Sequence, residues 1–406
     1  MYYFNKKTGF MISVIGGTYK EINLDNLSKE NFGSGLRSVY FLLENEVEVN
    51  FYTAGNNEVK DYLEVYKNSY NSFSYDCKFT NDFITFKYYF GLDNPNIYPN
   101  SSKINKSETI SVYDKNIICF GMLESNFEVN GDYVIYDPQT SSNPYRFSDF
   151  GRANKLIYIV NFNEAKSISR KNNISDIVEF FFNEEGVFAL IIKNGPHGAK
   201  LFTRENIKGH LIPSYITQNV FKIGSGDIFT TSFSYYLIVK GFSLEKAALY
   251  ASKTTALYCD KQIIKTNNLE NYVYDEFTNS LDNKQIYLAS PIFSLSDLIL
   301  VDKIREIFLD FGVKVFSPFH DIGLGNDDEI AKKDLEGLNQ SDIIFSIVDG
   351  LDSGTLIELG YGMAKNKKII SYHRTNEEES LIMLTPSNIK IFDNLTSAIY
   401  NTIWSL

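Results

Sequence analysis

The sequence predicts an α/β protein with two domains, and three observations carry this prediction. The chain has 406 residues, enough for two or three domains of ordinary size. Short apolar runs alternate with segments of helical periodicity both before residue 265 and after residue 285. Between these regions, residues 265–284 read KTNNLENYVYDEFTNSLDNK, a polar and weakly periodic stretch typical of a linker.

The C-terminal region alternates strands and helices most clearly. Apolar runs predict strands at 285–289, 313–316, 343–348 and 367–371, and apolar residues at helical spacing lie between them. The third run, IIFSIV, is almost entirely apolar, as expected of a strand that is buried on both faces of a parallel sheet. We therefore expect a doubly wound parallel sheet over residues 285–406.

The N-terminal region is also mixed α/β. Buried strands that lead into loops are predicted at ISVIGG (12–17), NKLIYIVNFNEA (154–165) and FALIIKNG (188–195). Apolar residues at helical spacing follow at 229–237 and 244–251. The alternating stretch FITFKYYF (83–90) suits a β-hairpin or a lid. These elements predict one α/β domain over residues 1–268.

Charge and composition exclude several classes of protein. The net charge of −11 argues against a nucleic-acid partner, because duplex-binding proteins are usually basic. No apolar run approaches the ~20 residues that a membrane-spanning helix needs. The first ten residues, MYYFNKKTGF, contain no apolar stretch of the kind found in leaders, so we expect a cytoplasmic protein. The three cysteines are far apart and predict neither disulfides nor a zinc site.

Two carboxylates lie close together after the third C-terminal strand. Asp352 stands in the loop before a predicted helix, and Glu358 stands in that helix. Ligands bind at the carboxyl ends of strands in open parallel sheets, and glycosyl transfer needs one carboxylate to attack the anomeric carbon and an acid to assist the leaving group. The alternative is that Asp352 and Asp349 cap the helix and Glu358 is a solvated first-turn residue. Spacing alone leaves the two interpretations even.

Three segments of this region resemble the nucleoside 2-deoxyribosyltransferases, including the related 2′-deoxynucleoside 5′-phosphate N-hydrolases. They are IYLASPIF (286–293), KKDLEGLNQSDIIFSIV (332–348) and DSGTLIELGYGMAKNKKII (352–370). The resemblance implies a flavodoxin-like sheet with Glu358 as the nucleophile that forms a glycosyl-enzyme intermediate. It implies that Asp334 and Asp352 hold the sugar and assist proton transfer, and that Tyr287 orients the Glu358 carboxylate.

One position in the last segment bears on the substrate. The 5′-phosphate hydrolases of this family have a Ser six residues before the nucleophile, whereas the transferases have an Asp there. This chain has Asp352 at that position. A carboxylate would repel a phosphate dianion, so we expect an unphosphorylated nucleoside.

The most informative N-terminal motif is FKIGSGDIFTTSF (221–233). Gly224, Ser225 and Gly226 form a turn before a predicted helix, where backbone N–H groups and the helix N-terminus favour an anion. Asp227 follows, where it could take a proton from a hydroxyl during phosphoryl transfer. The alternative is a glycine-rich turn with Asp227 as the helix cap.

Further segments resemble the ribokinase-like (PfkB) sugar and nucleoside kinases, which have an α/β sandwich with a small β lid. They are IYDPQ (135–139), NFNE (161–164), IIKNGPHGAKLF (191–202) and LEKAALYASKTTAL (244–257). The resemblance implies Asp227 as the base and Gly224, Ser225 and Gly226 as the anion hole. It also implies that Asn161 and Glu164 surround Mg²⁺ and that Asn194 and Gly195 lie near ATP.

The N-terminal half departs from the kinase pattern at two places. The substrate-binding Asp near the first strand is missing, and Glu21, Asn23 or Asp25 are the candidates to replace it. The segment that usually reads GG-x-x-x-N is FGSGLRS (32–38) and lacks the Asn. The identity of the kinase substrate is therefore open.

Together the two halves predict a bifunctional enzyme of nucleoside metabolism. The C-terminal domain would exchange or hydrolyse N-glycosidic bonds of (deoxy)nucleosides without a cofactor. The N-terminal domain would use ATP and Mg²⁺ to phosphorylate a pentose or nucleoside hydroxyl. The resemblance to both families also implies a homo-oligomer. The alternative is a degenerate kinase domain that senses a nucleotide and gates a nucleoside- or nucleotide-hydrolysing effector of a defence type.

Overall fold

The computed structural model describes residues 10–140, 142–323, 327–374, 381–382, 384 and 389–406. These residues form two compact units. Unit 1 contains the chain as far as Tyr215 together with Phe221–Glu276, and unit 2 contains Ile216–Val220 together with Phe277–Leu406. Within these ranges, no helix is long and apolar enough to cross a membrane. Residues 1–9 lie outside the described part; they include nearly all of the N-terminal segment in which no leader-like apolar stretch was expected.

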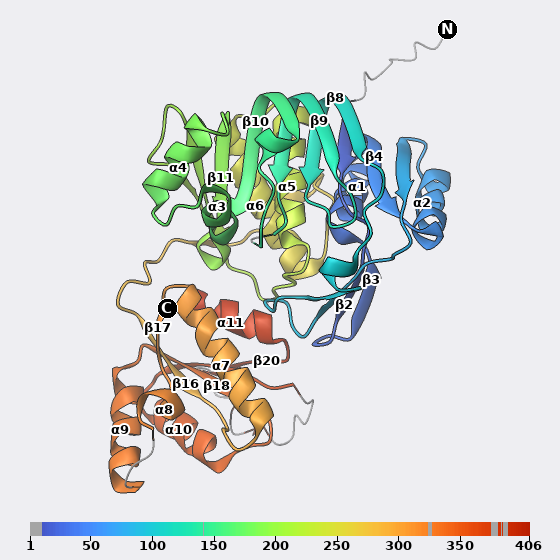
Figure 1. The fold of residues 1–406 in the computed structure, drawn as a ribbon. Helices are drawn as coiled ribbons and strands as arrows, with labels where there is room; N and C mark the ends of the chain where they lie inside the picture. The colour runs from blue at the N-terminus through green and yellow to red at the C-terminus, as the bar shows by residue number, and fades with distance from the viewer. Residues whose placement is uncertain (1–9, 141, 324–326, 375–380, 383, 385–388) are drawn as a thin grey trace. The chain divides into compact units, whose positions relative to one another are not determined.

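Unit 1 is built on a nine-stranded sheet (Figure 1). The seven strands from β11 to β5 run parallel to their neighbours, and β12 and β13 complete one edge in antiparallel pairing. In spatial order the strands are β13 (His210–Ile212), β12 (Ala199–Thr203), β11 (Ala189–Lys193), β10 (Gly151–Asn161), β9 (Phe127–Asp137), β8 (Ile110–Phe120), β1 (Met11–Ile15), β4 (Glu48–Gly55) and β5 (Phe73–Phe79).

Helices cover both faces of this sheet, because its strands alternate apolar side chains between two cores. Ile12 and Val14 of β1 enter one core, whereas Ile15 enters the other. The first core contains residues of α1 (Gly33–Glu44), α2 (Asn57–Ser69), α5 (Ser225–Ser234) and α6 (Leu244–Lys261). The second contains residues of α3 (Phe162–Ser169) and α4 (Ile174–Asn183). This confirms the predicted α/β sandwich.

A small second sheet in unit 1 confirms the predicted lid. Its four strands, in spatial order, are β3 (Ser28–Asn31), β2 (Lys20–Asn23), β6 (Thr85–Tyr88) and β7 (Asn96–Tyr98). Strand β6 lies within the alternating stretch FITFKYYF. The side chain of Glu21 on β2 reaches the N-terminal part of α1, so this sheet contributes to the site described below.

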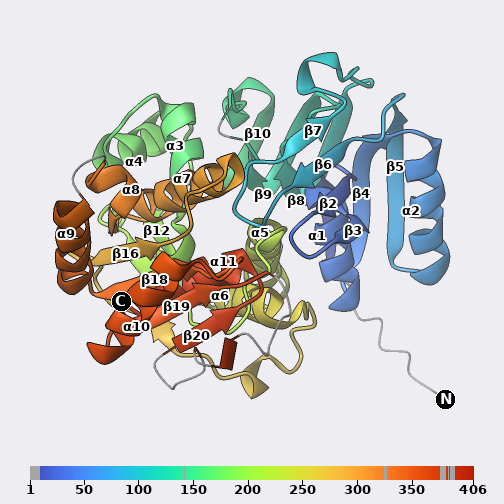
Figure 2. The same ribbon diagram turned by 90° about the horizontal axis from the view of Figure 1, so that it is seen from below.

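Unit 2 contains the predicted doubly wound sheet, with five parallel strands (Figure 2). In spatial order they are β17 (Lys314–Phe316), β16 (Gln285–Ala289), β18 (Ile343–Ile347), β19 (Lys368–Tyr372) and β20 (Ile389–Phe392). The helices are α7 (Leu295–Asp310), α8 (Pro318–Asp321), α9 (Asp327–Gln340), α10 (Ser353–Ala364) and α11 (Leu395–Trp404). The first four strands in chain order were predicted; β20, α8 and α11 were not.

Candidate functional site

Three of the predicted C-terminal site residues meet in unit 2. Tyr287 lies on β16, Asp334 on α9 and Glu358 on α10. The Tyr287 hydroxyl donates a hydrogen bond of 2.5 Å to Asp334 Oδ1, and the Tyr287 ring stacks on Phe316 with the ring centroids 5.8 Å apart. Tyr287 is completely buried, so the packing around β16 fixes the position of its side chain.

Burial sets the protonation of this cluster. It is the largest cause that raises the pKa of Glu358 to about 8, and the nearby charge of Asp334 raises it further, whereas the Tyr287 hydroxyl lowers it. Within the described part of the chain, Glu358 Oε2 is buried and has no hydrogen-bond partner. With its pKa raised to about 8, Glu358 is largely protonated near neutral pH.

Asp352 caps the N-terminus of α10, as the alternative interpretation expected. Its Oδ2 accepts hydrogen bonds from Thr355 N at 2.8 Å and Thr355 Oγ1 at 3.0 Å. The charge of Asp352 also contributes to the raised pKa of Glu358, so the two carboxylates lie near each other. Asp349 does not cap this helix; its Oδ1 accepts from Arg374 N at 2.7 Å. Glu358 lies beyond the first turn, since α10 begins at Ser353.

In unit 1 the GSGD motif forms the start of α5. Gly224 precedes the helix with φ at +78° and provides no side-chain cap, so Asp227 does not act as the helix cap. Asp227 is buried, and its Oδ1 accepts from Gln139 Nε2 at 3.1 Å. Burial is the largest cause that raises the pKa of Asp227 to about 6. The Ser225 N–H donates to Lys222 O at 3.1 Å, so the N–H of Gly226 is the first one in the helix that an anion could meet.

Arg37, on α1, is a site residue that the sequence interpretation did not identify. Its Nη1 donates to Asp227 Oδ2 at 2.7 Å, and its two Nη atoms form a fork with the Glu21 carboxylate. Of the three candidates for the missing acidic residue, Glu21 is therefore the one in this cluster. Asn23 instead accepts a hydrogen bond from the backbone N of Asp25 at 3.1 Å. Arg37 stands where the kinase pattern has Asn, and this replacement is the sequence feature that could have identified it.

A second charged cluster lies at the carboxyl ends of β9, β10 and β11. Lys193 Nζ and Thr230 Oγ1 both donate to Asp137 Oδ2 at 2.8 Å. Asn161 and Glu164 form a capping box at the start of α3, with bonds of 2.7 and 2.9 Å. Burial, and then the charge of Asp137, raise the pKa of Glu164 to about 7.

The fit of this second cluster to Mg²⁺ is partial. Among the described residues, no group of three or more His, Cys, Asp and Glu side chains is arranged to hold a metal ion. Asp137 and Glu164 nevertheless repel each other, and carboxylate oxygens are the ligands that Mg²⁺ prefers. Oxygens of a bound phosphate would have to complete the coordination, as is usual for this ion.

The residues expected near ATP follow β11. Asn194 and Gly195 lie in a short turn, closed by a bond of 2.7 Å from Asn194 N to Gly198 O. Lys222 was not predicted; its Nζ donates to Ser225 Oγ at 2.8 Å, at the start of α5. Burial, and the nearby Lys193, lower the pKa of Lys222. The carboxyl ends of the strands thus bring the predicted anion loop and two lysines together.

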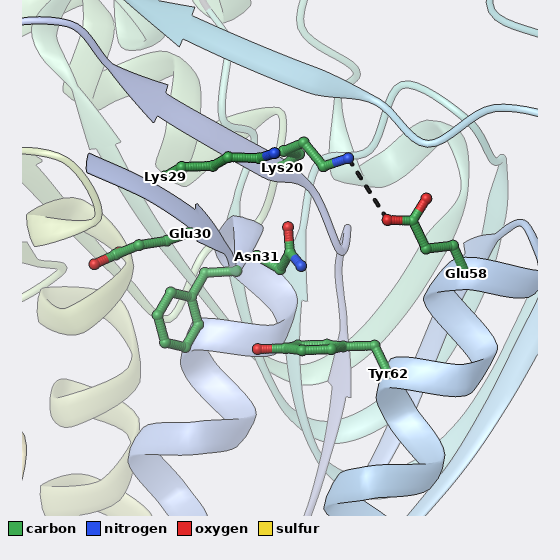
Figure 3. A pocket seen from close by; sticks show the side chains of 7 residues that line it. Lys20, Lys29, Glu30, Asn31, Glu58 and Tyr62 are labelled. Atoms are coloured by element: carbon green, nitrogen blue, oxygen red, sulfur yellow. Dashed lines mark ion pairs between the residues drawn. The ribbon is translucent and has the colours of Figure 1, made fainter. Parts of the chain in front are cut away.

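A separate hollow of about 400 Å³ lies between the small sheet and α2 (Figure 3). Lys20 and Glu58 face each other across it, with Nζ 3.6 Å from Oε1. Phe32 also lines the hollow, and the Arg37 guanidinium packs on the Phe32 ring at 5.2 Å. The hollow therefore backs onto the Arg37 cluster and contains none of the predicted site residues.

Comparison with known proteins agrees with this division. Residues 286–391 match the sequence profile of the nucleoside 2-deoxyribosyltransferase family. A search of the curated proteins found no match.

Among solved structures, the chain is similar to a ribokinase from Giardia lamblia, with 11% identity, a TM-score of 0.50, and coverage of 64% of this chain and 99% of that chain. A putative ribokinase II from E. coli has 14% identity, a TM-score of 0.48, and coverage of 64% and 98%. Ribokinase from Thermotoga maritima has 16% identity, a TM-score of 0.46, and coverage of 63% and 94%. The chain thus joins a domain of ribokinase fold to a C-terminal domain that matches the nucleoside 2-deoxyribosyltransferases.

Proposed function

We propose that unit 2 cleaves or exchanges the N-glycosidic bond of an unphosphorylated (deoxy)nucleoside, with Glu358 as the nucleophile. The observation that carries the proposal is the buried cluster of Glu358, Tyr287 and Asp334, in which one Glu358 oxygen has no described partner. A buried carboxylate oxygen without a hydrogen bond costs free energy, and bonding to an electron-poor sugar carbon would relieve that cost.

The raised pKa of Glu358 makes it the source of the proton for this chemistry. Glu358 gives up its proton and attacks C1′ of the nucleoside as a carboxylate. The C1′–N bond breaks, its electrons pass to the base, and the proton reaches the base nitrogen with the help of Asp334 or Asp352. Tyr287 supports the ionised state, because its hydroxyl lowers the pKa of Glu358. A second base, or water, then displaces Glu358 from C1′ in the reverse sense.

Base exchange between a deoxynucleoside and a free base tests this proposal. We expect wild-type protein to form the exchanged nucleoside, and Glu358→Ala to lose at least about 10³-fold of the rate, as expected for a nucleophile. Mass spectrometry of protein mixed with a deoxynucleoside alone should find one deoxyribosyl group on Glu358. Full activity in Glu358→Ala would contradict the mechanism.

For unit 1 we propose phosphoryl transfer from ATP to a hydroxyl of a small molecule. Asp227 would take the hydroxyl proton as the new O–P bond forms and the bond to the leaving diphosphate breaks. The N–H groups after Gly224, together with Lys193 and Lys222, would bind the transferred phosphoryl group. Mg²⁺, held by Glu164 and Asp137 with the donor phosphates, would neutralise phosphate charge. Acceptor-dependent ATP consumption that Asp227→Ala abolishes would support this activity; its absence in wild type would contradict it.

A second candidate function is favoured by the ion pair between Arg37 and Asp227. A general base that is already bound to a guanidinium suits a domain that binds a nucleotide without transferring its phosphate. In that case ATP would change the rate of base exchange by unit 2 while no phosphate is transferred. The same change in an Asp227→Ala variant would separate sensing from catalysis.

A further inference from the structure

The contacts of Arg37 in unit 1 bear on which kind of phosphoryl acceptor this domain would bind. Its side chain is almost fully buried. Both of its carboxylate partners lie on other elements: Glu21 on the lid strand β2 and Asp227 on α5. The Arg37 guanidinium therefore links the lid to the proposed general base.

The guanidinium fills the space beneath the anion loop. A Cβ atom on Gly224 would lie 2.2 Å from Arg37 Nε and 2.4 Å from Arg37 Cζ. On its other side the guanidinium packs on the Phe32 ring. A substrate hydroxyl that reaches Asp227 would therefore lie beside Arg37, whose Nη1 is 2.7 Å from Asp227 Oδ2.

The charges in this cluster do not balance. One guanidinium faces two carboxylates, and the Glu21 side chain takes the bidentate position on it. A neutral sugar hydroxyl is a poor replacement for a bidentate carboxylate, because charge-assisted bonds are roughly twice as strong as neutral ones. A carboxylate on the acceptor is a like-for-like replacement, and a phosphate group brings at least as much negative charge to the guanidinium. Arg is the residue that matches both groups in a planar fork.

We propose that Arg37 selects an acceptor that carries its own carboxylate or phosphate group, which takes the place of Glu21 on the guanidinium. Glu21 then acts as an internal competitor that occupies Arg37 when no acceptor is bound. Because Glu21 belongs to β2, exchange of the two anions accompanies displacement of the lid strand from the site. This inference rests on the proposed acceptor role of the Asp227 site.

Binding measurements test the inference without requiring turnover. Calorimetry would compare two matched pairs, 2-deoxyribose 5-phosphate with 2-deoxyribose and gluconate with glucose, with inorganic pyrophosphate present to saturate the anion loop. We expect the anionic member of at least one pair to bind at least about ten-fold more tightly than its neutral match. Which pair shows the difference distinguishes a phosphate from a carboxylate. Equal affinity within both pairs would overturn the proposal.

Two substitutions distinguish selection from a merely structural role. Arg37→Asn should abolish the preference for the anion, whereas Glu21→Gln, which removes the competitor, should raise the affinity for the anion several-fold. Arg152→Asn is the matched control, because Arg152 is exposed at the start of β10 and should change nothing. A Glu21→Gln variant with weaker anion binding would contradict the competitor role.

A measurement of phosphoryl transfer to each member of the two pairs then distinguishes failure of this inference from failure of the kinase proposal. Anion binding without transfer would overturn the kinase activity and leave the selectivity of Arg37 standing. Transfer to a neutral sugar at least as fast as to its anionic match would establish the kinase and refute the selectivity.

Discussion

Tyr287 donates its hydroxyl to Asp334 Oδ1 at 2.5 Å, and the same hydroxyl lowers the pKa of Glu358. A single phenol therefore serves two carboxylates that repel each other. The Tyr287 hydroxyl therefore favours the ionised form of Glu358.

Tyr287→Phe should slow base exchange by roughly 10- to 100-fold, because a hydrogen bond to a charged group is worth about 1.5–3 kcal/mol. Without the hydroxyl, less of Glu358 is ionised, and the loss should appear in kcat more than in KM. Tyr361→Phe is the control: Tyr361, at a half-buried position on α10, exchanges hydrogen bonds with Asn339. Equal losses in both variants would argue against the role of Tyr287.

The stability of unit 2 should fall as pH rises. The pKa of Glu358 is raised from 4.5 to about 8 in the folded chain, so between these values the folded state binds more protons than the unfolded state. The stabilisation is complete below about pH 4.5 and is lost as pH rises through about 8, on the order of 1 kcal/mol per pH unit.

Fluorescence of Trp404 can measure this loss, because it is the one tryptophan of the chain and lies on α11. We expect Glu358→Gln to raise the unfolding temperature relative to wild type near pH 8, by an amount that shrinks toward pH 5. Glu336→Gln, at an exposed position of α9, should follow wild type at both values. A constant difference between Glu358→Gln and wild type would count against the raised pKa.

Gly224→Ala should destabilise unit 1 more than backbone conformation alone requires. Gly224 has φ at +78°, and its Cβ would collide with the Arg37 guanidinium. Gly186 has φ at +65° with open space around it, so Gly186→Ala reports the backbone cost alone, about 1–2 kcal/mol. Urea unfolding followed by circular dichroism should show a larger loss for Gly224→Ala. The excess should disappear in an Arg37→Asn background.

Asn161 allows capping and metal binding to be separated. Asn161→Ala should cost about 1 kcal/mol of stability, because its side chain accepts from Glu164 N at 2.9 Å at the start of α3. Asn161→Ser keeps a good cap and should stay close to wild type in stability. If Asn161 also serves Mg²⁺, Asn161→Ser should require more Mg²⁺ for phosphoryl transfer. An unchanged Mg²⁺ requirement would leave the capping role alone.

The sheet of unit 2 was largely predictable because four of its strands are dense apolar runs. Its fifth strand, β20, reads IKIF, and only Ile389 of its four residues is buried, so its apolar pattern is short and weak. Tyr287 and Glu358 were expected from the resemblance to the nucleoside 2-deoxyribosyltransferases, and the structure brings them close together.

Arg37 could not be found in the same way. Its partner Asp227 is 190 residues away along the chain, and a lone Arg on an amphipathic helix reads as a solvated side chain. Only the three-dimensional approach of α1 to α5 turns it into a buried ion-pair partner. For Asp352 the sequence left two interpretations open, a helix cap and a residue of the glycosyl-transfer site. The structure shows that Asp352 caps α10 and also lies near Glu358.

The close approach of Gly224 to Arg37 also constrains how this domain can change by mutation. A side chain at position 224 carries the cost of its positive φ in either background, but it escapes the clash only after position 37 has become smaller, whereas shortening position 37 first meets no clash. The two positions are therefore epistatic, and one mutational order is open while the reverse order is closed. Libraries that vary both positions together would reach acceptor specificities that successive single substitutions, begun at position 224, cannot reach.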